Sequence, residues 1–261
     1  MTAIVQHNCG VSKHKGENLV LPCNHSVCHQ CWFGAIVSGR ANCAYCEFTS
    51  DDLHTFAEQK NTHGDTPLHN VIFSGLSEKI IEVLINKGAD VNACNNSCGT
   101  PLHCAIMSGS SEKIIEVLIN NGANVNARNN YGQTPLHYID SASIDSTSIE
   151  SIKLLIKHGA NVNAKDNNGD VPLFSAFYAK VNENFSETQK IEVILELLKN
   201  GADIKMANNE GELPFEKAID EGVCSADTIY NILKRTNADA SILLCIKLLS
   251  KINNKHQSEH K

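Results

Sequence analysis

The sequence has few aromatic residues, no long apolar run and no excess of positive charge. Aromatic side chains make up 5% of the 261 residues, and there is one tryptophan. No apolar stretch approaches the roughly 18–20 residues of a membrane-spanning helix, and the N-terminus lacks the charged and apolar regions of a signal peptide. A formal charge of −7 argues against a general affinity for nucleic acid or anionic membranes. We therefore expect a cytoplasmic protein, or one that works in a host cytoplasm if it is a secreted effector, with neither nucleic acid nor membrane as a partner.

The chain also lacks the patterns of enzymes that carry their own catalytic side chains. It contains no nucleophile–histidine–acid pattern, no paired carboxylates and no glycine-rich phosphate loop. Prolines are scarce: there are six, and five of them stand at one position of a repeating pattern. The informative features are therefore the repeats and the cysteines.

Two short strings recur in phase with each other. "TPLH" begins at Thr66, Thr100 and Thr134, which are spaced by 34 residues, and weaker copies follow as "VPLF" at 171–174 and "LPFE" at 213–216. The second string has the form "GADVNA", and its copies begin at Gly88, Gly122, Gly159 and Gly201. Phased repeats of this period are typical of stacked solenoids.

The chemistry of each unit predicts two helices between turns. Threonine suits a helix N-cap, and proline suits the position after it. Segments such as "EKIIEVLINKG" place apolar residues at intervals of three to four, as a buried helical face requires. A glycine then ends the helix in the left-handed conformation, and asparagine-rich turns such as "NARNNYGQ" connect one unit to the next.

These units resemble ankyrin repeats. The resemblance implies a mostly α fold, namely a helical solenoid with projecting hairpin turns and a concave binding face. We assign residues 61–250 to about five repeats, of which the last is degenerate and caps the array, since terminal copies shield the apolar surface. Residues 53–60 form a linker or the start of the solenoid, and 251–261 a disordered tail.

Several residues depart from the repeat pattern. Repeats three and four contain extra residues, which we place between their helices. Cys98 replaces the turn glycine of the other repeats, which predicts a shifted or strained turn. Recurring His69, His103 and His137 could bind metal, but the family resemblance favours bonds to the neighbouring threonine and backbone.

The repeat region is acidic and favours a protein partner with some basic surface. Turn tips and the inner face of the first helix are the expected contact positions. We select Asp65, Phe73, Met107, Tyr131, Gln133 and Tyr138.

Cysteine is the one residue type in clear excess, and six of the eleven lie in the first 46 residues. In an intracellular chain this density indicates metal binding before disulfides. Two Cys-x2-Cys pairs and a Cys-x-His are typical of a tetrahedral zinc site, and no single thiolate stands out as a nucleophile. The ligands are Cys23, His25, Cys28, Cys31, Cys43 and Cys46. A lesser alternative is a soft metal site formed by Cys94, Cys98 and Cys104.

The spacing within residues 1–52 resembles a RING finger, a small zinc-stabilised α+β module. The resemblance implies two structural zinc ions. One would take Cys23, His25, Cys43 and Cys46; the other would take Cys28 and Cys31 with Cys9 and His7, or with His14 in place of His7.

The resemblance further implies a RING-type ubiquitin ligase. Its repeats recruit a protein substrate and its zinc module docks a ubiquitin-charged E2 enzyme, with no covalent intermediate on the ligase. Trp32 and Val11 correspond to the E2-contacting positions, although Trp32 could instead pack over the zinc core. The alternative function is a zinc-stabilised ankyrin adaptor without ligase activity. The oligomeric state stays open.

Overall fold

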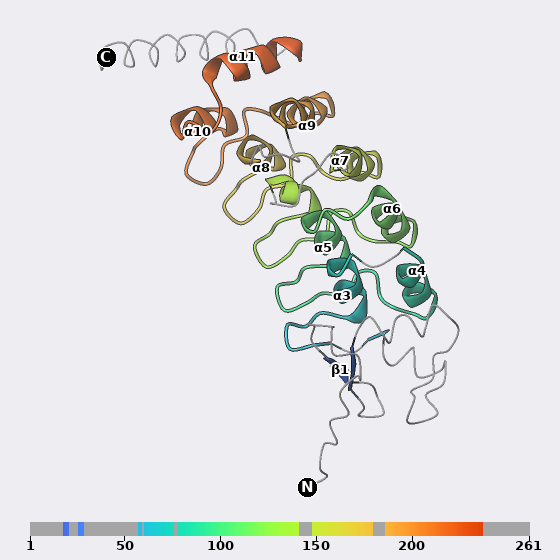
Figure 1. Cartoon of the computed structure of the whole chain (residues 1–261). Coiled ribbons are helices and arrows are strands. Elements are labelled where there is room, and N and C mark those ends of the chain that lie inside the picture. The colour runs from blue at the N-terminus through green and yellow to red at the C-terminus, as the bar shows by residue number, and fades with distance from the viewer. Residues whose placement is uncertain are drawn as a thin grey trace.

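The computed structural model describes residues 18–20, 26–28, 57–58, 60–75, 78–140, 148–179 and 186–236. Residues 60–236 form five helical pairs that stack into an elongated array (Figure 1). The first helices of the pairs are short: α3 (Pro67–Phe73), α5 (Pro101–Met107), η1 (Pro135–Asp140), α8 (Pro172–Tyr178) and α10 (Pro214–Asp220). The second helices are α4 (Glu78–Asn86), α6 (Glu112–Asn120), α7 (Ser148–Lys157), α9 (Glu187–Lys199) and α11 (Ala226–Arg235).

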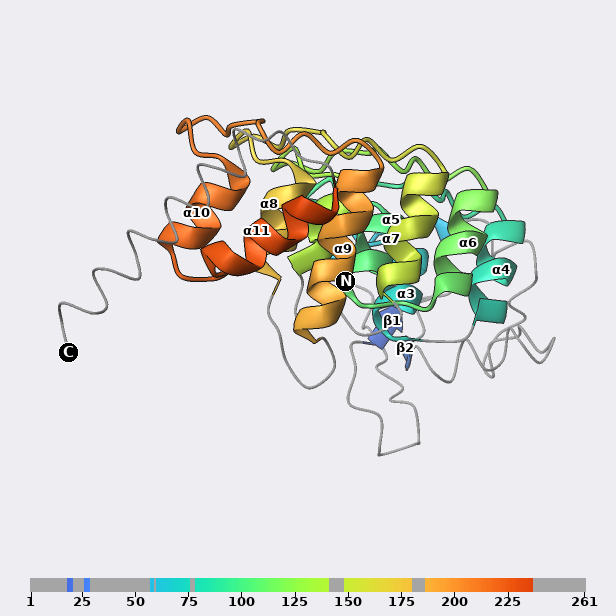
Figure 2. The same cartoon turned by 90° about the horizontal axis from the view of Figure 1, so that it is seen from above.

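The helices lie in two columns, as the two views show (Figures 1 and 2). We call the first helices of the pairs the inner helices and the second helices the outer helices. Each inner helix packs on the next inner helix, as α3 does on α5 and α8 does on α10. None of the helices in this described part of the chain has the length and hydrophobicity that a membrane span requires.

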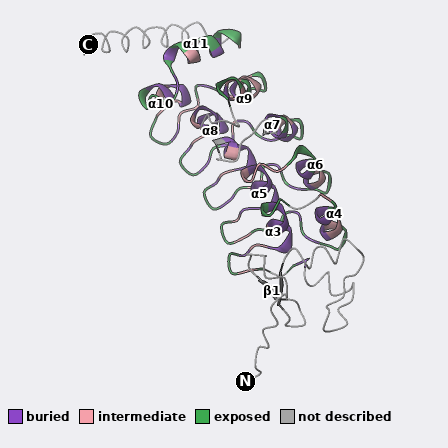
Figure 3. Ribbon diagram, viewed as in Figure 1, coloured by how far each residue is buried: buried purple, intermediate pink, exposed green. Residues whose placement is uncertain are grey.

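The core lies between the two columns and consists largely of equivalent positions of the repeats (Figure 3). A leucine of the inner helix and a leucine of the outer helix are almost fully buried in the first three repeats, with 0–1% of their surface exposed. They are Leu68 and Leu84, Leu102 and Leu118, and Leu136 and Leu155. Burying one such side chain contributes roughly 1.5–3 kcal/mol, so the periodic leucines supply much of the stability of each repeat.

The helix ends follow the predicted chemistry. Thr66, Thr100 and Thr134 precede the inner helices, and the first two have the extended backbone of an N-cap with proline directly after it. The predicted glycines lie two residues beyond the outer helices with positive φ, from 87° to 94°. The next amide bonds back to the last buried leucine, as Ala89 N–H does to the Leu84 carbonyl at 3.0 Å. This pattern is a Schellman motif, which satisfies carbonyls that the helix leaves free.

The inner helix of the third repeat differs from the prediction. It is a 3₁₀ helix, Pro135–Asp140, with a kink at Tyr138, rather than an α-helix. The sequence has Asp140 where the other repeats have isoleucine or phenylalanine. Ile139 is nevertheless 1% exposed and fills the core. The extra residues do fall between paired helices, because η1 ends before 141–147 and α8 before 180–185.

Two short strands precede the array. β1 (Asn18–Val20) and β2 (Ser26–Cys28) pair antiparallel, with Leu19 opposite Val27. Of the predicted module, residues 1–17, 21–25 and 29–52 lie outside the described residues.

Candidate functional site

Five tight turns project from the inner-helix side of the array (Figure 1). We call them the tip turns, residues 61–65, 95–99, 129–133, 166–170 and 208–212. Each is closed by a backbone bond, for example Asn129 N–H to the Gln133 carbonyl at 3.0 Å. The Asn129 side-chain oxygen also accepts the amides of Tyr131 and Gln133, at 2.9 and 3.0 Å. An asparagine or aspartate at the start of every tip turn forms the same pair of bonds, so the side chain fixes the turn.

Neighbouring tip turns are bonded to each other through a second asparagine. Asn130 N–H donates to the Ser97 carbonyl at 2.9 Å, and its side-chain amide donates to the Asn96 carbonyl at 3.0 Å. Asn96, Asn167 and Asn209 form equivalent pairs with the preceding turn. The asparagine-rich composition of these turns therefore has a structural cause: each asparagine replaces solvent as the partner of a neighbouring backbone.

The outermost residues of the tip turns are exposed although their backbone is fixed. Tyr131 is 65% exposed, the highest value among the large apolar side chains of the described residues. A tyrosine buries a large area on binding and has few rotatable bonds to immobilise. A rigid row of exposed side chains can bind a partner at a low cost in conformational entropy.

A histidine joins each of the first three inner helices to the next tip turn. Nδ1 of His103 accepts from the Thr100 N–H at 3.1 Å and lies 2.9 Å from the Thr100 hydroxyl. Nε2 of His103 lies 3.1 Å from the Gln133 carbonyl oxygen. Since a carbonyl can only accept, Nε2 carries the proton and Nδ1 accepts from threonine.

His69 and His137 form the same bonds, to the Gly99 and Asp170 carbonyls at 3.0 and 3.1 Å. We call these three imidazoles the histidine links. The structure thus confirms the structural interpretation of the recurring histidines over metal binding. The bond to the next repeat is a feature that the sequence analysis missed.

The histidine links are held in the neutral form. Burial lowers the pKa of His69, His103 and His137, and the carbonyl bond of each ring only partly opposes that effect. A second proton would stand on Nδ1, where the threonine amide already points its hydrogen. Protonation therefore breaks the cap and is disfavoured in the fold.

The fourth repeat lacks a histidine link. It has Val171 and Phe174 where the earlier repeats have threonine and histidine. Phe174 is 4% exposed and packs in the core, but its ring offers no nitrogen to the tip turn that follows. The Asn209 N–H and side-chain amide still donate to the Asn168 and Asn167 carbonyls, both at 2.9 Å, so these bonds join the fourth and fifth tip turns without a histidine.

Three of the predicted partner contacts serve the array itself. The Asp65 carboxylate accepts a hydrogen bond from the Asn95 side chain of the next tip turn, at 2.8 Å. The Gln133 carbonyl receives the His103 link. Tyr138 is half-buried, its hydroxyl accepts from the Asn129 side chain at 2.8 Å, and its ring meets His103 edge-on at 5.9 Å. These three residues lie on the predicted face, but each already forms a hydrogen bond within the array.

The other predicted contacts are more open. Phe73 is 44% exposed, and Met107 occupies the equivalent position of the next inner helix and is half-buried. Tyr178 stands at the same position of the fourth repeat and is half-buried. Phe73 borders a groove of about 750 Å³ at the C-terminal ends of α3 and α5, which also contains Lys79, Ser108 and Ile114.

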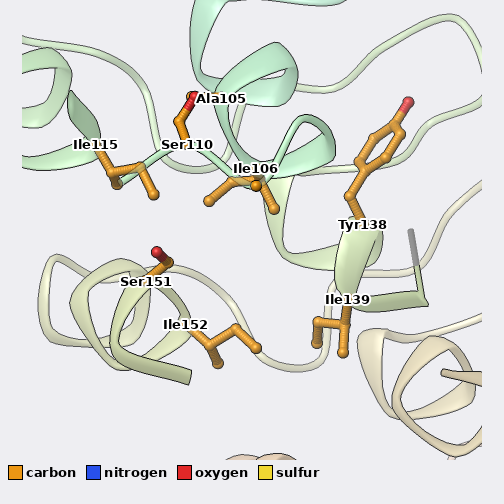
Figure 4. Close-up of a pocket in the computed structure, with 9 residues that line it drawn as sticks. Ala105, Ile106, Ser110, Ile115, Tyr138, Ile139, Ser151 and Ile152 are labelled. Carbon is orange, nitrogen blue, oxygen red and sulfur yellow. The ribbon is translucent and has the colours of Figure 1, made fainter. Parts of the chain in front are cut away.

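A smaller space lies between the second and third repeats (Figure 4). Ile106, Ile115, Ile139 and Ile152 surround it, and Ser151 stands where the first two outer helices have isoleucine. Its volume of about 10 Å³ is close to that of one water-sized sphere, so it is too small for an organic ligand.

No group of three or more histidine, cysteine or acidic side chains gathers among the described residues, which argues against Cys94, Cys98 and Cys104 as ligands of one ion. Cys94 is exposed, whereas Cys104 is buried in α5. Of the N-terminal zinc ligands, Cys28 is the last residue of β2, and the rest lie outside the described residues, as do Val11 and Trp32. Those assignments stay predictions.

Comparison with known protein families identifies Ankyrin repeats (3 copies) in this chain. The three overlapping matches cover residues 51–129, 68–166 and 113–208. Together they span 51–208, which is more than half of the 261 residues. No match was found among curated proteins.

Proposed function

We propose, from the premise that this chain belongs to the ankyrin-repeat family, that it recruits a protein substrate to a RING-type ubiquitin ligase module. Ankyrin repeats indicate protein–protein interaction, and the repeats of this chain are its partner-binding part. The observation that carries the proposal is the row of tip turns, whose backbone is bonded from turn to turn while the outermost side chains stay exposed.

The binding surface consists of the tip turns and the exposed ends of the inner helices. Tyr131 supplies the largest exposed aromatic surface on the tips, and Phe73 supplies it on the inner helices. Exposed aromatics of this kind are frequent binding hot spots. Neighbouring polar groups, mainly asparagine side chains, are engaged in the array, so binding displaces few internal bonds.

The ligase half of the proposal rests on the donor set of residues 1–52. Cysteine sulfur and histidine nitrogen are the ligands that structural zinc prefers. β1 and β2 pair antiparallel with Val20 opposite Ser26, and Cys23 and His25 stand between these two strands in the sequence. Four-ligand zinc ions would supply the core that so short a segment cannot build alone.

In this proposal the chain contributes position rather than covalent chemistry. Trp32 and Val11 contact the E2 enzyme, and the repeats hold the substrate so that its lysine meets the ubiquitin thioester. Holding two reactants together can lower a barrier by roughly 7–11 kcal/mol. The adaptor alternative shares the repeats and the zinc ions but lacks the E2 contact.

Ubiquitin transfer and metal content test the ligase half. We expect the full chain to bind two zinc ions and to build ubiquitin chains with E1, a panel of E2 enzymes, ubiquitin and ATP. His25→Ala should abolish transfer. Trp32→Ala should abolish transfer while zinc content is unchanged. Zinc-bound protein that is inactive with every E2 would instead support the adaptor.

A variant pair tests the binding surface. Proteins cross-linked to the full chain in cells are identified, and each is then purified and titrated directly. A true partner loses affinity for Tyr131→Ala but not for Glu82→Ala, an exposed site on α4 in the other column. Equal affinity for both variants would place the partner elsewhere.

A further inference from the structure

Cys98 has a backbone conformation that every other tip turn gives to glycine. Its φ is 54°, and it is the one non-glycine residue with positive φ among the described residues. The equivalent glycines have φ values between 75° and 83°. They are Gly64, Gly132, Gly169 and Gly211. A residue with a Cβ is less stable by roughly 1–2 kcal/mol in this left-handed region of φ and ψ than in the right-handed region. Cysteine at position 98 therefore destabilises the fold relative to glycine.

The turn itself is unchanged by the cysteine. Cys98 N–H donates to the Asn95 carbonyl at 2.9 Å, as Gly132 does to Asn129 in the next turn. The sequence prediction of strain is therefore confirmed and that of a shifted turn is wrong. A strained residue in an otherwise regular structure is a reason to ask what its side chain does.

Cys94 is the natural partner of this thiol. Cys94 directly precedes the tip turn 95–99, and Cys98 is the fourth residue of that turn. Asn95 N–H donates to the Gly99 carbonyl at 3.0 Å, and Cys98 N–H donates to the Asn95 carbonyl at 2.9 Å. Cys94 and Cys98 therefore meet at the base of one closed turn.

Both thiols can be reached from solvent. Burial raises the pKa of the Cys94 thiol, and the neighbouring Cys98 thiol raises it further. Cys94 is exposed and Cys98 is half-exposed, whereas Cys104 and Cys224 are buried. Accessible, adjacent thiols are the ones that exchange with disulfides.

We propose that Cys94 and Cys98 form a reversible intramolecular disulfide, so that this tip turn is a site of thiol oxidation by low-molecular-weight disulfides such as glutathione disulfide. The Cys98 thiolate attacks one sulfur of glutathione disulfide and expels one glutathione thiolate. The Cys94 thiolate then attacks the Cys98 sulfur of the mixed disulfide and expels the second. Two thiols lose two electrons and two protons, one S–S bond forms, and glutathione disulfide is reduced to two molecules of glutathione.

The site does not depend on the identity of the partner or on the zinc module. Its turn lies beside that of Tyr131, because Asn130 bonds both Asn96 and Ser97. A disulfide here would alter the surface next to the largest exposed aromatic side chain.

Redox titration of the full chain tests the proposal. The protein is equilibrated with fixed ratios of reduced and oxidised glutathione, quenched with acid, alkylated and digested with trypsin. The peptide 88–113 contains Cys94, Cys98 and Cys104. We expect this peptide to lose two hydrogens as the buffer becomes oxidising, with fragment ions that place the bond between Cys94 and Cys98. Cys104 should be alkylated only after denaturation.

Two variants separate the outcomes. In Cys98→Gly the intramolecular bond should be lost, and Cys94 should accumulate as a mixed disulfide with glutathione. In Cys104→Ala the bond should persist. Stable glutathione adducts on wild-type Cys94 or Cys98, or loss of the bond in Cys104→Ala, would overturn the proposal.

Discussion

Nε2 of His103 lies 3.1 Å from the carbonyl oxygen of Gln133, so the inner helix of the second repeat is bonded to the tip turn of the third. The same ring accepts from Thr100 at its own helix cap. One side chain therefore stabilises its own repeat and fixes the next one. This double role explains why the motif recurs at constant phase, since neither bond survives a change of spacing.

Replacing His103 with alanine should destabilise the array. The change leaves the buried Thr100 amide and the Gln133 carbonyl without these bonds, which costs about 1–3 kcal/mol for an unsatisfied buried group. Urea unfolding of the full chain should show a lower midpoint. His158→Ala, at an exposed position after α7, is the control and should change stability by less than about 0.5 kcal/mol. Equal shifts in both variants would contradict the link.

The histidine links make stability depend on pH. Burial lowers the folded pKa of all three rings below the ordinary value of 6.5. As pH falls below about 6.5, these histidines therefore bind more protons in the unfolded chain than in the folded chain, and the free energy of unfolding decreases. Above that pH these rings contribute no slope.

Urea midpoints at about pH 7.5 and about pH 5.5 measure this slope. The midpoint should be lower at the acidic pH, and His103→Ala should show a smaller decrease than the wild type. A decrease of the same size in both would mean that His103 does not contribute.

Tyr131 and Tyr138 were predicted as equivalent contacts, and the structure separates them. Tyr131→Ala removes a side chain that is 65% exposed, so the melting temperature should stay nearly unchanged. Tyr138→Ala removes the acceptor of the Asn129 amide and the ring that packs on His103, and should cost about 1–3 kcal/mol. Calorimetry of both variants distinguishes the roles. A large loss in Tyr131→Ala would assign that residue to the fold.

Cys98→Gly and Gly132→Ala, at equivalent positions of two tip turns, should have opposite effects on stability. Cys98→Gly relieves a left-handed residue and should stabilise the reduced protein by about 1 kcal/mol. Gly132→Ala places a Cβ at φ 75°, within 2.5 Å of the Arg128 Nη2 and in conflict with the Asn167 side chain, and should destabilise. Chemical unfolding under reducing conditions compares the two. Destabilisation by Cys98→Gly would show that the thiol itself supports the turn.

The repeat architecture was predictable because its causes are local. A helix N-cap, an apolar helix face and a C-terminal glycine recur in the repeats. The roles of Thr66, Leu84 and Gly88 can therefore be predicted from the residues next to them in the sequence. The predicted helix pairs, glycine C-caps and position of the extra residues are confirmed. The 3₁₀ helix at Pro135–Asp140 was missed because it begins with the same Thr-Pro-Leu-His string as the α-helical units.

The partner surface was only partly predictable because bonding between repeats is not visible in one repeat. Asp65, Gln133 and Tyr138 are polar and lie on the expected face, yet each is already bonded. Asn95 of the next tip turn bonds Asp65, His103 of the preceding inner helix bonds the Gln133 carbonyl, and Asn129 bonds Tyr138. Tyr131 and Phe73 remain exposed. The zinc ligands and the ligase function rest on sequence spacing and stay predictions.

The absence of a histidine at Phe174 has a consequence for how the array opens. The links at His69, His103 and His137 tie the repeats up to the fourth tip turn, whereas the turn that ends at Glu212 receives none. Repeat arrays behave as chains of nearest-neighbour couplings, so the weakest coupling decides where a segment detaches. Amide hydrogens of α10 and α11 should therefore exchange with deuterium earlier than those of α5 and α6, and the last pair should fray while the rest stays folded.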